Sequence, residues 1–169
     1  WLCTDTSWKF VHGDLHFDNT IYEYHPFKGR PSSSAIVNQK IWDELRDKAV
    51  YKFTAIDWRT DFGGTLYGDQ YVDLAKMLGG LFQSYKDIKS ELYSYKEEND
   101  YATIEVPHIT DVAHYEEKLR LWVEANGLDW RKVQLLVPII YLNMSPLHEA
   151  PFDKFLVALS QYHFSKVLD

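Results

Sequence analysis

The stretch Val11-His12-Gly13-Asp14-Leu15-His16-Phe17-Asp18-Asn19 is the most informative part of this chain. It places a carboxylate, Asp14, five residues before a carboxamide, Asn19. Protein-kinase-like phosphotransferases use this spacing: the Asp accepts the proton of the attacking hydroxyl, and the Asn binds a magnesium ion. Asp suits the first role because it is ionised at neutral pH, and the Asn carbonyl is a neutral, hard oxygen ligand. Taken alone, the motif also fits a purely structural loop.

A second carboxylate, Asp57, follows a segment that is typical of a β-strand. Residues 51–56 are rich in aromatic and β-branched side chains, and residues 19–24 form another probable strand. If the two pair as an antiparallel hairpin, the start of the first lies beside the end of the second. Asn19 and Asp57 would then converge, with Asp14 in the turn just before them. Mg²⁺ prefers one or two carboxylates plus substrate phosphates, so the sequence predicts a magnesium site here.

These motifs and two that follow them resemble the aminoglycoside phosphotransferase and choline kinase superfamily. The residues that carry the resemblance are His12-Gly13-Asp14-Leu15-His16 with Asn19, then Ile56-Asp57, then Gly68-Asp69 with Asp73-Leu74-Ala75. Members of that superfamily are small-molecule kinases with a protein-kinase-like fold. The resemblance implies Asp14 as the catalytic base, Asn19 and Asp57 as magnesium ligands, and Asp73 as a buried brace for the catalytic loop. It covers about positions 8–80, and residues 81–169 resemble the family only in being helical.

The implied fold class is α+β, mostly α: the C-terminal lobe of a protein-kinase-like fold, with a short β-hairpin that carries the catalytic site. One domain is expected over residues 1–169, with an insertion over 25–50 in the hairpin. A complete kinase also needs a lobe with a glycine-rich loop and a strand lysine. Only eleven residues precede His12, and Lys9 lies in the strand that enters the loop. We therefore expect the N-terminal ATP-binding lobe of the same protein to be missing here, and this fragment to be inactive alone.

The periodicity of apolar residues predicts the helices. The expected elements are a strand over 8–11, a short helix over 41–50, and helices over 71–85 (capped by Asp69), 111–126, 131–141 (bent by Pro138) and 152–167. Residues 86–109 are mixed and charged, and their pattern favours no single element.

Composition limits the function classes. The net charge of −7 argues against a nucleic-acid surface, and no apolar run is long enough to span a membrane. The single Cys3 excludes an internal disulfide and fits a reducing compartment, so we expect a cytoplasmic protein. The cofactors implied are Mg²⁺ and ATP, with the nucleotide bound mostly by the missing lobe, and the partner is a small-molecule substrate.

Other residues near the motif have two interpretations each. His12 fits a structural residue that packs the loop better than a proton carrier. His16 fits either a phosphate contact or a hydrogen bond that braces the loop. Trp58, with Tyr67 and Trp42, fits a cage for a quaternary ammonium group, although ordinary packing is the simpler explanation in a chain with 16% aromatic residues.

Asp61-Phe62-Gly63 spells the tripeptide with which protein kinases bind magnesium. We favour Asp57 over Asp61, because Asp57 directly follows the predicted strand. A continued strand would carry Asp61 about 13 Å further from Asn19, at ~3.3 Å per residue.

Two other functions compete with a kinase. Gly13-Asp14-Leu15-His16 and the block from Gly68 to Asp73 superficially resemble motifs of two-metal phosphoesterases, but no Asn-His pair is present to complete such a site. A non-catalytic, pseudokinase-like binding lobe is the second alternative, and the intact set of Asp14, Asn19 and Asp57 argues against it.

Overall fold

The computed structural model of the chain describes residues 8–25, 50–59, 67–107 and 111–168. Within these ranges the elements are β1 (Trp8–Phe10), the 3-10 helix η1 (Phe17–Asn19), β2 (Thr20–His25), β3 (Val50–Ala55), β4 (Tyr67–Asp69), α2 (Gln70–Phe82), α3 (Tyr85–Lys89), β5 (Ser94–Glu98), β6 (Tyr101–Glu105), α4 (Val112–Ala125), α5 (Trp130–Met144), the 3-10 helix η2 (Ser145–Leu147) and α6 (Phe152–Leu168). The described strands form three two-stranded antiparallel sheets. The predicted α+β, mostly α class is confirmed.

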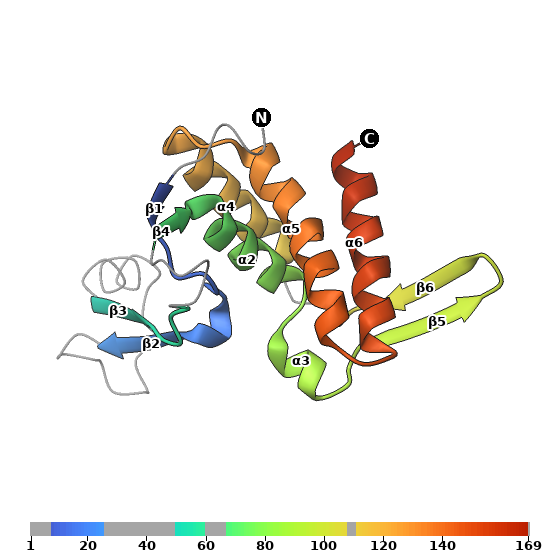
Figure 1. Cartoon of the computed structure of the whole chain (residues 1–169). Helices are drawn as coiled ribbons and strands as arrows, with labels where there is room; N and C mark the ends of the chain where they lie inside the picture. The colour runs from blue at the N-terminus through green and yellow to red at the C-terminus, as the bar shows by residue number, and fades with distance from the viewer. Residues whose placement is uncertain (1–7, 26–49, 60–66, 108–110, 169) are drawn as a thin grey trace, which may run out of the picture.

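Helices α2, α5 and α6 build the core. Figure 1 shows α5 between the other two, and the packing of α5 against α6 and of α2 against α5 is the most extensive between helices. Leu74 and Leu78, four residues apart, point inward from one face of α2. The core is completed by Val133, Val137, Phe155, Leu156 and Leu159, all nearly inaccessible to solvent. Burying each of these side chains stabilises the fold by about 1.5–3 kcal/mol.

Three of the four predicted long helices match α4, α5 and α6 to within a few residues. The helix predicted over 71–85 ends earlier, at Phe82. The reason is local: the Ser84 hydroxyl accepts a hydrogen bond from the Asp87 N–H and begins a separate short helix, α3. At the other end, the Asp69 carboxylate accepts from the Tyr71 N–H, as expected of a helix cap.

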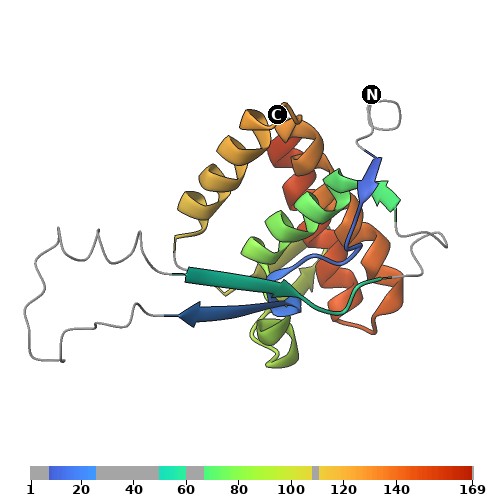
Figure 2. The same cartoon turned by 90° about the vertical axis from the view of Figure 1, so that its left-hand side faces the viewer.

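The predicted hairpin is present as β2 and β3. Thr20 pairs with Ala55, and the ladder runs in register to the pair of His25 and Val50. Figure 2 shows the two strands as a ribbon beside the helices, with one end next to η1. The predicted loop and helix inside the 25–50 insertion lie outside the described residues.

Two pairings were absent from the sequence prediction. β1 pairs with β4, so that Trp8 faces Asp69 and Lys9 faces Gly68. Gly68 is needed there, because a Cβ at this position would lie 2.9 Å from the Val11 side chain. This small sheet joins the chain before the Asp14 loop to the start of α2.

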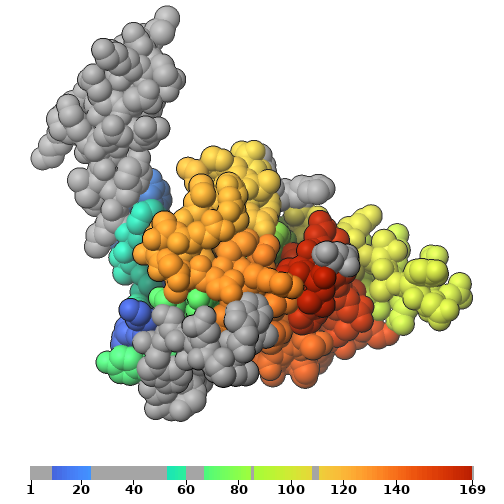
Figure 3. All heavy atoms as spheres, turned by 90° about the horizontal axis from the view of Figure 1, so that it is seen from above, coloured from blue at the N-terminus to red at the C-terminus, as the bar shows by residue number. Residues whose placement is uncertain are grey.

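The segment that the sequence left unassigned contains a second hairpin, β5 and β6, in which Ser94 faces Glu105. It projects beyond α6 (Figures 1 and 3). Its base is attached to the core, because Tyr93 packs on Phe152 and Phe155. Among the described residues, no helix is long and apolar enough to cross a membrane.

Candidate active site

The loop of residues 11–19, called the Asp14 loop below, is held by helix α2. One Asp73 carboxylate oxygen accepts a hydrogen bond from the His12 N–H at 2.7 Å, and the other accepts from the Gly13 N–H at 2.8 Å. Asp73 is 9% exposed, so both bonds lie in a water-poor environment where charge-assisted bonds are strong. Gly13 has a φ of 81°, a left-handed conformation that glycine adopts without strain. The sharp turn therefore puts two consecutive N–H groups on one carboxylate.

His12 joins this loop to the end of β3. Its Nε2 lies 2.7 Å from the Ile56 carbonyl oxygen, and its Nδ1 lies 3.3 Å from the Asp14 backbone nitrogen. The two contacts fit one tautomer, in which Nε2–H donates to Ile56 and Nδ1 accepts from Asp14. The Arg59 N–H also donates to the His12 carbonyl at 3.0 Å. His12 is therefore fully engaged in structure, as the simpler of its two interpretations expected.

Asn19 and Asp57 come together at the end of the hairpin. The Ile56 N–H donates to the Asn19 carbonyl at 2.9 Å, and the Asn19 side-chain Nδ2 donates to the Asp14 carbonyl at 3.0 Å. These bonds fix the carboxamide and leave its Oδ1 as the candidate metal ligand. Asp57, the next residue after Ile56, has a φ of 57°. A positive φ at a non-glycine residue costs energy, and such strain gathers at functional sites.

The Asp14 carboxylate is surrounded by basic side chains. Lys76 Nζ lies 2.9 Å from Oδ1, Arg59 Nη2 lies 3.3 Å from Oδ2, and His16 Nε2 lies 3.9 Å from Oδ2. Burial by itself raises the pKa of Asp14, but the Lys76 hydrogen bond and the charges of Lys76, His16 and Arg59 outweigh it and lower the pKa. Asp14 is therefore held as a carboxylate, the form that accepts a proton or a hydrogen bond.

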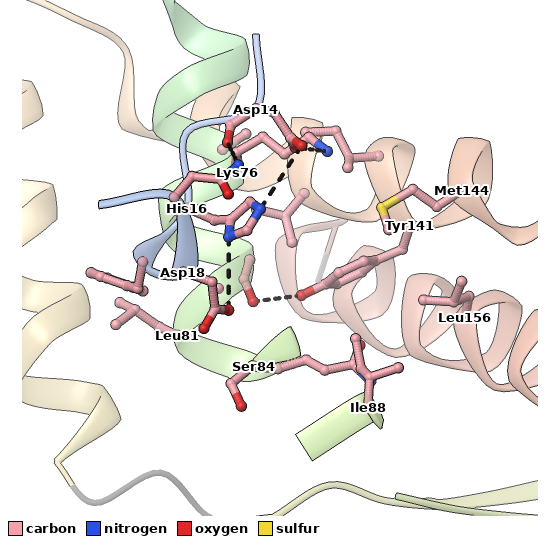
Figure 4. Close-up of a pocket in the computed structure, with 18 of the residues that line it drawn as sticks. Asp14, His16, Asp18, Lys76, Leu81, Ser84, Ile88, Tyr141, Met144 and Leu156 are labelled. Carbon is pink, nitrogen blue, oxygen red and sulfur yellow. Dashed lines mark hydrogen bonds and ion pairs between the residues drawn. The ribbon is translucent and has the colours of Figure 1, made fainter. Parts of the chain in front are cut away.

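One cavity of about 1250 Å³ contains these groups. Figure 4 shows Asp14, His16 and Lys76 at one end of it and Ser84 and Ile88 at the other. The end near the Asp14 loop is polar, and its lining includes Asp14, Asp18, Asn19, Asp57, Arg59 and Lys76. The far wall is mostly apolar and includes Ile88, Ile140, Tyr141, Met144, Leu147 and Leu156. Tyr141 is fixed in this wall, since its hydroxyl donates to the Gly79 carbonyl at 2.9 Å.

The two predicted substrate contacts lie in different places. His16 lines the cavity, with Nδ1 3.8 Å from Asp18 and Nε2 facing Asp14, so it both borders the space and braces the loop. Trp58 is absent from the cavity lining. Its indole N–H donates to the Ala55 carbonyl, and its ring packs on Phe10 and His12. Packing explains Trp58 here, and Trp42 of the suggested cage lies outside the described residues.

The donor atoms near the hairpin end fit a magnesium ion better than a soft metal. Within the described ranges, no three His, Cys, Asp or Glu side chains gather around one point. A metal here would be held by Asp57, the Asn19 amide oxygen and oxygens of a substrate, which is a set that Mg²⁺ accepts. The comparison of Asp57 with Asp61 is not decided, since Asp61 lies outside the described residues.

Lys76 and Arg59 are the site residues that the sequence analysis missed. A signal for Lys76 was present: it lies three residues after Asp73 on the same helix, and residues at that spacing share a face. Once Asp73 was assigned to the loop, Lys76 was the next side chain able to reach it. Arg59 had no comparable signal, because it follows the left-handed turn at Asp57.

Comparison of the chain with models of protein families, with curated proteins and with solved structures found no significant match. The function is therefore argued from the geometry of the chain itself.

Proposed function

We propose that this chain carries the catalytic site of an ATP-dependent phosphotransferase that acts on a hydroxyl group of a small metabolite, in a C-terminal lobe of protein-kinase-like fold. One observation supports this most strongly. Asp14, Asn19 and Asp57 come from two segments separated by a long insertion, yet they line the same end of one cavity. This is the arrangement of base and metal ligands that phosphoryl transfer to an alcohol requires.

In this proposal Asp14 accepts a hydrogen bond from the acceptor hydroxyl and orients its oxygen toward the γ-phosphorus of ATP. The new O–P bond forms as the bond between the γ-phosphorus and the β,γ-bridging oxygen breaks, and ADP leaves. The hydroxyl proton passes to Asp14. Because neighbouring cations lower the pKa of Asp14, we infer that it mainly orients the alcohol and takes the proton late. Asn19 and Asp57 would hold Mg²⁺, which neutralises charge on the phosphates.

Asp73 and His12 support the site from behind. Asp73 fixes the backbone at residues 12 and 13, immediately before Asp14, through two short hydrogen bonds. His12 ties the same turn to Ile56, immediately before Asp57. The base and a metal ligand are thus positioned by one small network, and an error of 1 Å in such positions is costly for catalysis.

The far part of the cavity favours a neutral, hydroxylated acceptor with an apolar face, such as a sugar. The acidic residues among those lining the cavity are Asp14, Asp18 and Asp57, and all belong to the hairpin end. The described far wall instead offers apolar side chains and the polar side chains of Gln83, Ser84, Lys89, Asn143 and His148, none of which is acidic. A polycationic aminoglycoside would lack carboxylate partners there, which makes it the weaker candidate.

The phosphoesterase alternative receives little support from the geometry. Both oxygens of Asp73 are occupied by backbone N–H groups, and Asp69 Oδ2 lies 3.2 Å from Lys132 Nζ. The two carboxylates that would bind a second metal therefore have other partners.

The test uses the protein at the full length that its gene encodes. It is assayed with Mg²⁺ and ATP against panels of sugars, amino alcohols and aminoglycosides. We expect ATP-dependent phosphorylation of a hydroxylated acceptor, lost in Asp14→Asn and kept in the control Asp153→Asn, which lies on α6 away from the cavity. Phosphate release from simple esters without ATP would favour the phosphoesterase, and nucleotide binding without transfer would favour the pseudokinase.

A further inference from the structure

Lys76 occupies a special place relative to the proposed base. It projects from the same face of α2 as Asp73, one turn later. Asp73 binds the backbone of the Asp14 loop, whereas Lys76 binds the Asp14 side chain itself, with Nζ 2.9 Å from Oδ1. Figure 4 shows this contact at the polar end of the cavity. The Lys76 side chain is 20% exposed and is among the residues that line that space.

The contact competes with the function proposed for Asp14. A carboxylate that orients a hydroxyl accepts a hydrogen bond from it, but Lys76 already binds Oδ1 and Arg59 approaches Oδ2. Each carboxylate oxygen has two lone pairs, so an alcohol would share its oxygen with one of these cations, and displacing that cation frees the oxygen for the alcohol. Arg59 is largely exposed, whereas Lys76 is mostly enclosed, so losing a counter-ion would cost Lys76 more. Lys76 therefore leaves Asp14 most readily when another anion takes the place of the carboxylate.

A phosphate group in this end of the cavity would be that anion. A phosphoryl group about to react with a hydroxyl on Asp14 lies within a few ångströms of Oδ1. The flexible four-carbon stem of a lysine allows its ammonium to move that far.

We propose that Lys76 is a phosphate-binding residue that pairs with Asp14 in the empty site and transfers to the phosphate when one enters, thereby freeing Asp14 Oδ1. The assignment of the phosphate as the group being transferred rests on the function proposed above. The phosphate site itself, in which Lys76 exchanges a carboxylate for a phosphate, does not depend on that proposed function.

The test is a binding titration of residues 1–169 with inorganic phosphate in the presence of Mg²⁺, followed by NMR of the Asp14 carboxyl carbon and the Lys76 side chain. In the wild type, phosphate should shift both signals and raise the pKa of Asp14, because the carboxylate loses its nearest cation. Lys76→Met should weaken phosphate binding by about tenfold or more, which is the loss expected for one charge-assisted hydrogen bond.

Lys89→Met is the matched control. Lys89 lines the same cavity but is not among the charges that lower the pKa of Asp14, so its removal should change phosphate affinity less than about twofold. Lys76→Arg, which keeps the charge, should restore most of the binding. If Lys76→Met fails to fold, the wild-type titration and Lys76→Arg still report on the exchange.

Equal phosphate affinity in Lys76→Met and the wild type would overturn the proposal and leave Lys76 as a structural ion pair. An Asp14 signal that does not respond to phosphate would overturn it as well. If phosphate binding depends on Lys76 but the full-length protein transfers no phosphoryl group, the phosphotransferase proposal fails and the phosphate site stands.

Discussion

Replacing Asp73 with Asn tests the network that positions the Asp14 loop. Asp73 accepts two hydrogen bonds, from the N–H groups of His12 and Gly13, at 2.7 and 2.8 Å. A hydrogen bond to a charged group contributes about 1.5–3 kcal/mol, and a buried donor without a partner costs about 1–3 kcal/mol. Asn retains one acceptor oxygen but turns an NH₂ group toward the second N–H. We therefore expect Asp73→Asn to lower the free energy of unfolding by about 2–4 kcal/mol.

Urea unfolding measures the global loss, and amide hydrogen exchange locates it. In Asp73→Asn the amides of His12 and Gly13 should exchange about a hundredfold faster, because local opening loses about 2–3 kcal/mol of protection. Asp153→Asn is the control, since the hydrogen bond that Asp153 accepts among the described residues comes from the neighbouring Lys154 N–H on α6. If these two amides exchange at the wild-type rate in Asp73→Asn, the loop is held by other contacts and the reasoning is wrong.

Three further changes test other parts of the structure. Burial, with a smaller contribution from the charge of Lys166, lowers the pKa of His163 to about 4. As the pH falls, His163 is therefore protonated in the unfolded chain before it is protonated in the folded one. The free energy of unfolding should be at its full value above about pH 6.5 and should decrease between pH 6.5 and pH 4. His163→Phe should flatten that fall in urea unfolding measured at pH 7.5 and 5.0. Gly13→Ala should cost about 1–2 kcal/mol in the same measurement, because φ is 81° at this residue. In the full-length protein, Asp14→Asn should lower kcat by about 10²–10⁴-fold under saturating substrates while the circular dichroism spectrum is unchanged.

The parts of the fold that the sequence predicted are those that local patterns determine. Aromatic and β-branched residues marked β3, an amphipathic pattern marked α4, and apolar residues marked α5 and α6. The pairing of the two hairpin strands could be predicted from sequence, because one strand begins at Asn19 and the other ends just before Asp57. That pairing brought Asn19 and Asp57 to one end of the ribbon, as the register of Thr20 with Ala55 shows.

The parts that the sequence missed depend on contacts between distant segments. The strand predicted over 8–11 is present as β1, but its partner, the three-residue β4, was missed, because the two pair across the loop and the hairpin. β5 and β6 carry many charged and exposed residues, and they are attached to the core by Tyr93, which packs on Phe152 and Phe155, and by the half-buried Tyr95 and Ile104. The ion pair of Lys76 with Asp14 likewise joins residues far apart in the chain, and its sequence signal was the helical spacing of Lys76 from Asp73.

Asp57 allows the conformational role of a residue to be separated from its chemical role. Its backbone has a φ of 57°, which asparagine and glycine tolerate and alanine does not. Asp57→Ala should therefore lower the free energy of unfolding by about 1 kcal/mol, whereas Asp57→Asn and Asp57→Gly should stay within about 0.5 kcal/mol of the wild type.

The three Asp57 variants should rank differently in metal binding than in stability. If the Asp57 carboxylate holds the ion, all three variants lose the metal response, including the two that are as stable as the wild type. Broadening of nearby amide signals by Mn²⁺, a paramagnetic substitute for Mg²⁺, measures this response in the 169-residue chain. If Asp57 binds the metal through its carboxylate, Asp57→Gly will be as stable as the wild type but will not bind Mn²⁺. If Asp57 serves only to form the turn, Asp57→Gly will still bind Mn²⁺, and that result would remove Asp57 from the proposed magnesium site.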